Sequence, residues 1–194
     1  MQNVHPAMAL TFTSSETSIL QEKGPQAASA QLSMDAVYQR FAPYVAAIAS
    51  RILGRQVEVQ DVVQDVFAVA LRGLARREDT GQIKRWLATV TVRHATAKLR
   101  ERALWQLFDK GDSTDYATLA DPGATPEERQ LIEEVYRVLD KVPAKDRVAW
   151  VLRYVEGEQL EAVAELCGCS LATAKRRIAT AHDKITRHVT GGRS

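Results

Sequence analysis

Long apolar runs, a secretory leader and an abundance of cysteine are all missing from this chain of 194 residues. No apolar run approaches the roughly 20 residues that a helix needs to cross a bilayer, so we do not expect membrane insertion. The first residues, MQNVHPAMALTFTSS, lack the basic start and continuous apolar core of a secretory signal. Only two cysteines are present. We therefore expect a cytoplasmic protein.

Motifs for catalysis and for metal binding are also missing. The sequence has no glycine-rich phosphate-binding loop and no nucleophile motif. Cys167 and Cys169, with His182 and His188 further on, suggest zinc at first sight. However, Cys-x-Cys is not the usual zinc-finger spacing, and Cys167 fits the core of a helical turn. We expect neither an enzyme nor a metal or other cofactor.

The hydrophobic pattern predicts an all-α fold, because several segments keep helical spacing and no strand pattern of useful length appears. Ser33 can cap a first helix that ends at Gly54, and Pro126 can begin a later one. The predicted helices run from Ser33 to Gly54, then over 57–74, 83–104, 126–139 and 144–154, followed by a helix-turn-helix.

Composition divides the chain into two small helical domains joined by a flexible linker. Residues 1–32 are rich in Ser, Thr, Gln and Ala and should form a disordered N-terminal arm. The first helical domain covers 33–108. Residues 109–126, DKGDSTDYATLADPGATP, have the composition of an acidic linker. The second helical domain covers 127–194 and contains the helix-turn-helix.

Residues 157–188 predict this helix-turn-helix. A short helix stops at Gly168, which can adopt a left-handed conformation, and Ser170 can cap the next helix. A buried stripe follows at helical spacing: Leu171, Ala174, Ile178, Ala181 and Ile185. The opposite side is polar and basic: Thr173, Arg176, Arg177 and Thr180, flanked by Lys175 and Lys184. Such a face suits the DNA major groove, although a merely solvated face has the same pattern.

The net charge is only +2, but the charges are segregated. Residues 84–102 contain six Lys or Arg against one acid, and residues 171–194 also contain six against one. The intervening stretch 109–140 contains nine acids and three bases. Two basic blocks separated by an acidic span suggest two contacts with one polyanion.

The second helix carries three acids, Glu58, Asp61 and Asp65, at spacings that place them in a row, with Gln64 adjacent. Such a row is either a solvated face or a docking surface for a basic partner. The pattern alone leaves both interpretations open.

The third helix becomes steadily more basic towards its end. Arg93 and Arg100 share a face with two threonines, a mixture that suits a nucleic-acid surface. Trp86 either packs in the core, where its position on the apolar stripe places it, or stacks on an unpaired base.

The order of these segments resembles the sigma-70 family of bacterial RNA polymerase initiation factors, in particular the extracytoplasmic-function type, which retains regions 2 and 4. The resemblance covers nearly all of residues 34–189. The matching segments are FAPYV and RILG between Phe41 and Gly54, QDVVQDVF at 60–67, RWLATVTVRHATAKLR at 85–100 and LDKVPAKDRVAWVLRYVEG at 139–157.

This resemblance implies a factor that binds core RNA polymerase, directs it to promoter DNA and assists melting. It also implies an anti-sigma factor that holds the two domains together, and a linker that lies near the polymerase active-site channel. Polymerase binding carries over to Asp61, Gln64 and Asp65. Downstream-element recognition and melting carry over to Trp86, Arg93, His94 and Arg100. Upstream-element recognition carries over to Ser170, Thr173, Lys175, Arg176, Arg177 and Thr180.

The chain departs from the family pattern in region 2. The family commonly has Asn after the arginine that corresponds to Arg93, and Asp four residues later, where this chain has His94 and Lys98. An imidazole and an ammonium cannot make the contacts of an amide and a carboxylate. His94 is therefore either a DNA-contacting residue or a partly buried structural one.

The alternative function is an autonomous helix-turn-helix repressor or activator. It would bind two-fold symmetric sites as a dimer and would not need polymerase. An initiation factor would instead bind free DNA weakly and form a one-to-one complex with core polymerase.

Overall fold

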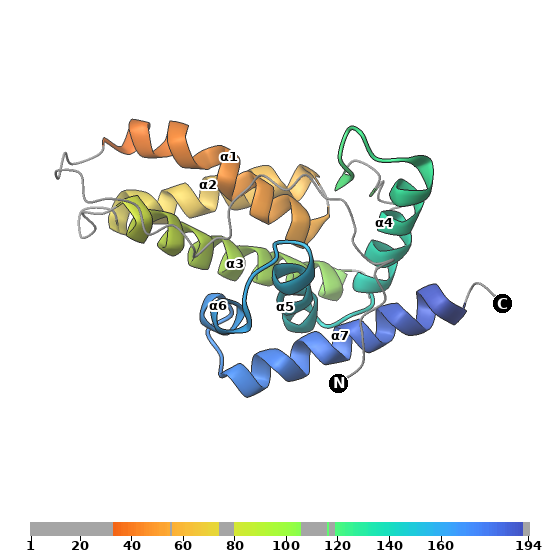
Figure 1. Cartoon of the computed structure of the whole chain (residues 1–194). Coiled ribbons are helices and arrows are strands. Elements are labelled where there is room, and N and C mark those ends of the chain that lie inside the picture. Colours follow the sequence, from red (N-terminus) through yellow and green to blue (C-terminus); the bar gives the residue numbers. More distant parts are fainter. Residues whose placement is uncertain (1–32, 55, 74–79, 106–115, 117–118, 192–194) are drawn as a thin grey trace.

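The computed structural model describes residues 33–54, 56–73, 80–105, 116 and 119–191, and this part of the chain contains helices and no strand (Figure 1). The predicted all-α class is therefore confirmed. The predicted N-terminal arm and half of the predicted linker lie outside the described residues. The helices are α1 (Met34–Leu53), α2 (Gln56–Gly73), α3 (Thr80–Trp105), α4 (Pro126–Leu139), α5 (Ala144–Tyr154), α6 (Leu160–Leu166) and α7 (Leu171–Gly191).

Local capping chemistry sets several helix boundaries where the sequence predicts them. The Ser33 hydroxyl accepts the Ala36 N–H at 3.2 Å, which caps the start of α1. Gly54 ends the same helix with a φ of 72°. At α4 the Thr125 hydroxyl and the Glu128 carboxylate cap each other's backbone N–H groups. These contacts satisfy backbone groups that a helix end leaves open.

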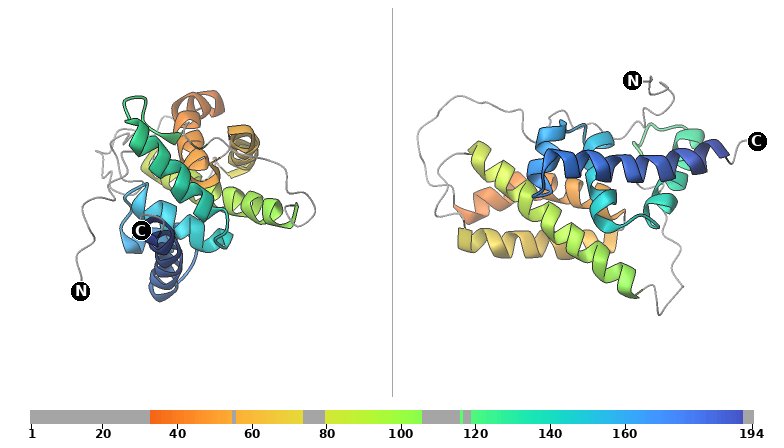
Figure 2. Two further views of the ribbon diagram at one scale, coloured as in Figure 1. Left: turned by 90° about the vertical axis from the view of Figure 1, so that its right-hand side faces the viewer. Right: turned by 90° about the horizontal axis from the view of Figure 1, so that it is seen from below.

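The helices form two groups that share one hydrophobic core. In the first group, α1, α2 and α3 pack against one another. In the second group, α7 is the long helix on which α4, α5 and α6 pack (Figure 2). The groups meet where α5 contacts α1 and α3, and where α6 contacts α3. Their buried residues form a single cluster, so in this structure the two predicted domains are packed together.

Hydrogen bonds between the two helix groups gather at the carbonyl end of α1. Arg147 of α5, which is only 1% exposed, donates from Nε to the Ile52 carbonyl at 2.8 Å and from Nη2 to the Leu53 carbonyl at 2.9 Å. The Tyr136 hydroxyl of α4 donates to the Arg51 carbonyl at 2.6 Å. The last carbonyls of α1, which have no partner within the helix, are thus satisfied by the other helix group.

Part of the predicted linker is packed against the same junction. The ring of Tyr116 stacks on the ring of Tyr136. The Tyr116 hydroxyl donates to the Asp140 carboxylate. Gly54 makes room for this ring, since a Cβ atom at that position would lie 2.6 Å from a Tyr116 ring carbon. The linker is therefore anchored at Tyr116 beside the end of α1.

Candidate nucleic-acid interface and acidic face

The helix-turn-helix forms as the sequence predicts. Gly168 has a φ of 58° after α6, and the Ser170 hydroxyl accepts the Thr173 N–H at 3.2 Å at the start of α7. The two hydroxyls also lie 2.9 Å apart. The predicted buried stripe begins at Ala174, because Leu171 is 37% exposed. Ser170 and Thr173 thus cap the start of α7, and they also lie at the end of the helix that is predicted to contact DNA.

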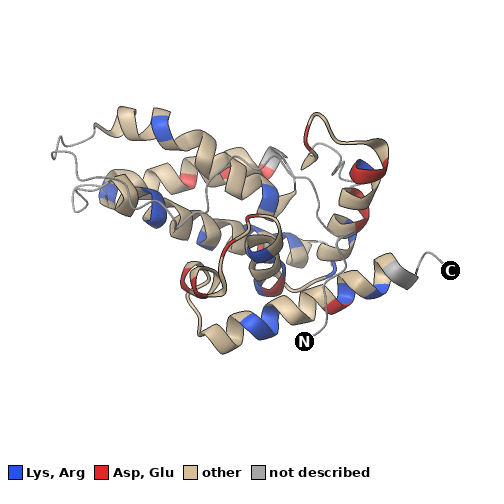
Figure 3. Ribbon diagram, viewed as in Figure 1, with Lys and Arg blue, Asp and Glu red and all other residues tan. Residues whose placement is uncertain are grey.

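The outward face of α7 is cationic and open. Lys175, Arg176 and Thr180 are exposed, and Arg177 is half-buried. Among the described residues, no acid lies within ion-pair distance of these three cations. Figure 3 shows these basic positions in blue on the first half of α7. The Thr180 hydroxyl donates to the Arg176 carbonyl at 2.9 Å, so it already has a partner in its own helix. The guanidinium and ammonium groups are the free donors of this face.

The predicted basic block on α3 divides into three parts. Arg93 and Arg100 are exposed and have no acidic partner among the described residues. Arg85, near the start of the helix, is paired with Glu165 of α6. Arg102 is 8% exposed and donates to the Leu53 carbonyl, so it belongs to the core and not to a nucleic-acid surface.

Trp86 is half-buried and packs against the hydrophobic core. This position agrees with the core-packing interpretation, and it leaves part of the indole on the surface of α3. The threonines that share the face of Arg93 and Arg100 are bonded to their own helix: Thr89 donates to the Arg85 carbonyl and Thr96 to the Val92 carbonyl. The arginines are therefore the charged groups that this face offers to a ligand.

The acids of α2 are neither free nor merely solvated, because each faces a base of α3. The innermost pair joins Glu58 to Arg102 at 2.5 Å. Asp61 Oδ2 lies 3.4 Å from Lys98 Nζ. We call this row, with the Asp65 and His94 pair described next, the charge ladder.

The outermost pair of the charge ladder joins Asp65 Oδ2 to His94 Nδ1 at 3.5 Å. In this structure His94 is half-buried and faces a carboxylate of α2. The Asp61 and Asp65 side chains nevertheless remain 59% and 56% exposed. Gln64, between them in sequence, is exposed as well. The row can therefore still be reached by a partner.

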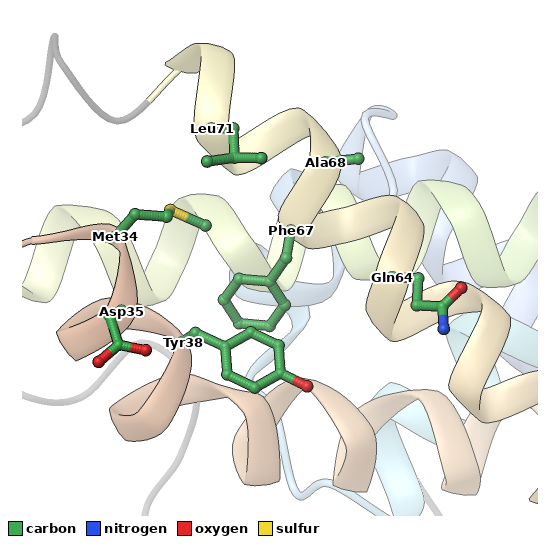
Figure 4. A pocket seen from close by; sticks show the side chains of 7 residues that line it. All are labelled: Met34, Asp35, Tyr38, Gln64, Phe67, Ala68 and Leu71. Carbon is green, nitrogen blue, oxygen red and sulfur yellow. The ribbon is translucent and has the colours of Figure 1, made fainter.

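An apolar groove lies next to the charge ladder. It has a volume of about 440 Å³ and lies between the start of α1 and the second half of α2. In Figure 4 the rings of Tyr38 and Phe67 lie side by side in its floor, packed edge to face with a centroid separation of 4.7 Å. Leu71 is 66% exposed at its edge, and Gln64 lines the end nearest the acids. Sequence reasoning missed this groove, although Phe67 and Leu71 repeat at a four-residue spacing beside the acidic row.

The two cysteines lie at the helix-turn-helix turn and are both half-buried thiols. Burial raises the pKa of Cys167 to about 12, so this group stays protonated near neutral pH. Among the described residues, no three His, Cys, Asp or Glu side chains gather in a way that could hold a metal ion.

Comparison with known proteins identifies both helix groups. A family model described as Sigma-70 region 2 matches residues 37–104, and one described as Sigma-70, region 4 matches residues 132–184. Together they cover more than half of the chain. The chain belongs to the sigma-70 family. The charge ladder and the basic face of α3 thus lie within region 2 of this sigma factor, and the exposed face of α7 lies within region 4.

Relatives of this sigma factor belong to the extracytoplasmic-function (ECF) type, as predicted. The ECF RNA polymerase sigma factor EcfG of Rhodopseudomonas palustris is 27% identical over 144 residues, which cover 74% of this chain and 78% of the relative. The ECF RNA polymerase sigma-E factor of Escherichia coli is 28% identical over 159 residues, which cover 77% of this chain and 83% of the relative.

The sigma factor RpoE of Bartonella quintana, solved in complex with the anti-sigma factor NepR, has a similar fold. The TM-score is 0.59 at 21% identity, and the match covers 80% of this chain and 96% of that one. None of the described helices combines the length and the apolar character that crossing a bilayer requires.

Proposed function

We propose that this sigma-70 family member is a transcription initiation factor that binds core RNA polymerase, directs it to specific promoters and assists strand separation. One observation carries the proposal. Each of the two matched regions presents a cationic helix face that has no acidic partner among the described residues, Arg93 and Arg100 on α3 and Lys175 with Arg176 on α7, while Asp61 and Asp65 are exposed on a different helix, α2.

The exposed face of α7 reads the upstream promoter element. Helix-turn-helix proteins place the start of the second helix in the major groove, and this is where Thr173, Arg176 and Arg177 lie. A guanidinium can donate to the O6 and N7 atoms of a guanine at once, which distinguishes this base from the others. Lys175 is a point charge and is suited to phosphate contacts. Ser170 and Thr180 complete the face.

The exposed face of α3 binds the downstream element. Arg93 and Arg100 neutralise phosphates, and the exposed part of the Trp86 indole can stack on an unpaired base. Capturing unpaired bases offsets the few kcal/mol that unstacking costs, so strand separation becomes favourable once polymerase holds the rest of the promoter. His94 faces α2 in the free protein and would have to turn away from Asp65 to contact DNA.

Polymerase docks on α2. Asp61 and Asp65 are exposed carboxylates that can pair with a basic partner surface, and Gln64 lies between them and the apolar groove. Charges at the rim of an interface steer the encounter, whereas apolar groups and aromatic rings in pockets supply most of the affinity. The acids and the groove floor of Tyr38 and Phe67 offer both on one surface.

An anti-sigma factor is the proposed inhibitor. The neighbour from Bartonella quintana was solved with such a partner. In the present chain, the packed arrangement joins Arg85 of α3 to Glu165 of α6 and caps the end of α1 with Arg147. A partner that binds both helix groups would stabilise this arrangement and keep α3 and α7 from contacting separate promoter elements.

Run-off transcription tests the proposal. Bacterial core polymerase, free of other sigma factors, is mixed with genomic DNA fragments and the purified chain. We expect discrete transcripts only when both proteins are present. Absence of transcripts and of a complex with core polymerase, together with tight binding of palindromic DNA by a homodimer, would instead establish an autonomous repressor or activator.

A further inference from the structure

The charge ladder pairs the proposed polymerase-docking acids with bases of the promoter-binding helix. Its three pairs run in antiparallel order, Glu58, Asp61 and Asp65 on α2 against Arg102, Lys98 and His94 on α3. The spacing of three and four residues on α2 matches the spacing of four on α3, so each acid meets one base.

The pairs of the charge ladder differ in burial. Arg102 is 8% exposed and also donates to the Leu53 carbonyl, so the innermost pair is a structural part of the core. The Lys98 side chain is 29% exposed, and its partner Asp61 is the more exposed member of that pair. Only the outer pairs can therefore open without disturbing the core.

Two carboxylates lie beside the Lys98 ammonium group. Burial alone would lower its pKa, but the nearby carboxylates of Glu101 and Asp61 outweigh burial and raise the pKa of Lys98 above its ordinary value. The ammonium thus stays charged at every pH of interest. Glu101 Oε2 lies 3.6 Å from Lys98 Nζ, so the ammonium keeps one carboxylate partner if Asp61 is taken by another protein.

We infer that Lys98 is an intramolecular counter-ion that weakens the docking of polymerase on Asp61 and the neighbouring Asp65. This inference rests on the proposed function. A basic partner surface that pairs with Asp61 must compete with Lys98 for this carboxylate, and the Lys98 ammonium then lies close to the partner's own cations. Lys98 is accordingly a positioning residue that sets affinity for polymerase, and it is not a reader of promoter bases.

Two features of these ion pairs limit how much the removal of Lys98 can raise the affinity for polymerase. Ion pairs between exposed side chains contribute little in water, and Glu101 compensates part of what Lys98 loses when Asp61 binds another cation. We expect that Lys98→Met increases the affinity for core polymerase about two- to fivefold at low salt. The increase should shrink as salt is added, because screening weakens the competing pair as well.

The test is a titration of the full-length chain with core polymerase in the absence of DNA, at low and at high salt. Lys98→Met is compared with Lys98→Arg, which keeps the cation, and with Lys141→Met, which removes an exposed cation from the loop after α4. A fourth variant combines Lys98→Met with Asp61→Asn and is compared with Asp61→Asn alone. Urea denaturation of each variant separates folding from binding.

We expect tighter binding for Lys98→Met only, with wild-type affinity for Lys98→Arg and Lys141→Met. The effect of Lys98→Met should disappear when Asp61 is already Asn. Unchanged or weaker binding by Lys98→Met would overturn the inference, as would a defect seen only with promoter DNA, which would make Lys98 a DNA-binding residue. Failure of the wild-type chain to bind polymerase would overturn the proposed function as well.

Discussion

Arg147→Met should destabilise the fold strongly, because this guanidinium joins the two helix groups from a fully buried position. It donates to the Ile52 and Leu53 carbonyls and, from Nη1, to the Asp140 carboxylate at 2.6 Å. Methionine fills a similar apolar volume but donates no hydrogen bond. The Ile52 carbonyl then loses its only described side-chain donor, whereas Leu53 and Asp140 keep other partners.

The magnitude follows from these acceptors. One buried acceptor left without a partner costs about 1 to 3 kcal/mol, and removing one member of a buried ion pair costs about 3 to 5 kcal/mol. Since Asp140 is partly exposed and keeps the Tyr116 hydroxyl, we expect the free energy of unfolding to fall by about 3 kcal/mol.

Urea denaturation followed by circular dichroism measures this loss. The matched control is Arg137→Met, which removes an exposed guanidinium that pairs with Glu133 one turn away on α4. That change should alter the free energy of unfolding by no more than about 0.5 kcal/mol. A loss for Arg147→Met as small as that of the control would refute the assignment of Arg147 as the polar centre of the junction.

Three further predictions concern binding and pH. Asp61→Arg combined with Asp65→Arg should abolish co-elution with core polymerase while the helical circular dichroism signal persists; retained co-elution would exclude this docking face. Arg176→Ala should weaken upstream-element binding by about 1 to 3 kcal/mol in a promoter titration, and no loss would remove it from the readers. Burial raises the pKa of Glu156, despite the adjacent Arg51 guanidinium. Because the unfolded chain then ionises first, stability should fall as pH rises above about 4, and Glu156→Gln should remove this contribution; an unchanged pH slope in the variant would contradict it.

The elements that the sequence predicts well are those fixed by short-range chemistry. Ser33, Gly54, Gly168 and Ser170 set helix ends through contacts within a few residues, so their roles can be read from the chain. The exposed face of α7 follows from helical periodicity alone, because its buried stripe is regular.

The charge ladder could not be predicted in this way. In the sequence, Arg102 and Lys98 are part of a basic stretch that suits nucleic-acid binding, because only their charge and their basic neighbours can be seen there. Their partners Glu58 and Asp61 lie about 40 residues earlier, and only the antiparallel packing of α2 and α3 brings them together. The apolar groove escaped prediction for the same reason, since its floor joins α1 to α2.

Mapping of unpaired thymines by permanganate, together with footprinting of the complex with core polymerase and promoter DNA, tests the central claim most directly. If α7 and α3 contact separate stretches of one promoter, Arg176→Ala should lose protection of the upstream element. Arg93→Ala combined with Arg100→Ala should keep that protection and lose the reactive thymines of the melted segment. If each variant lost both the upstream protection and the reactive thymines, or lost neither, the assignment of separate promoter elements to α7 and α3 would be contradicted.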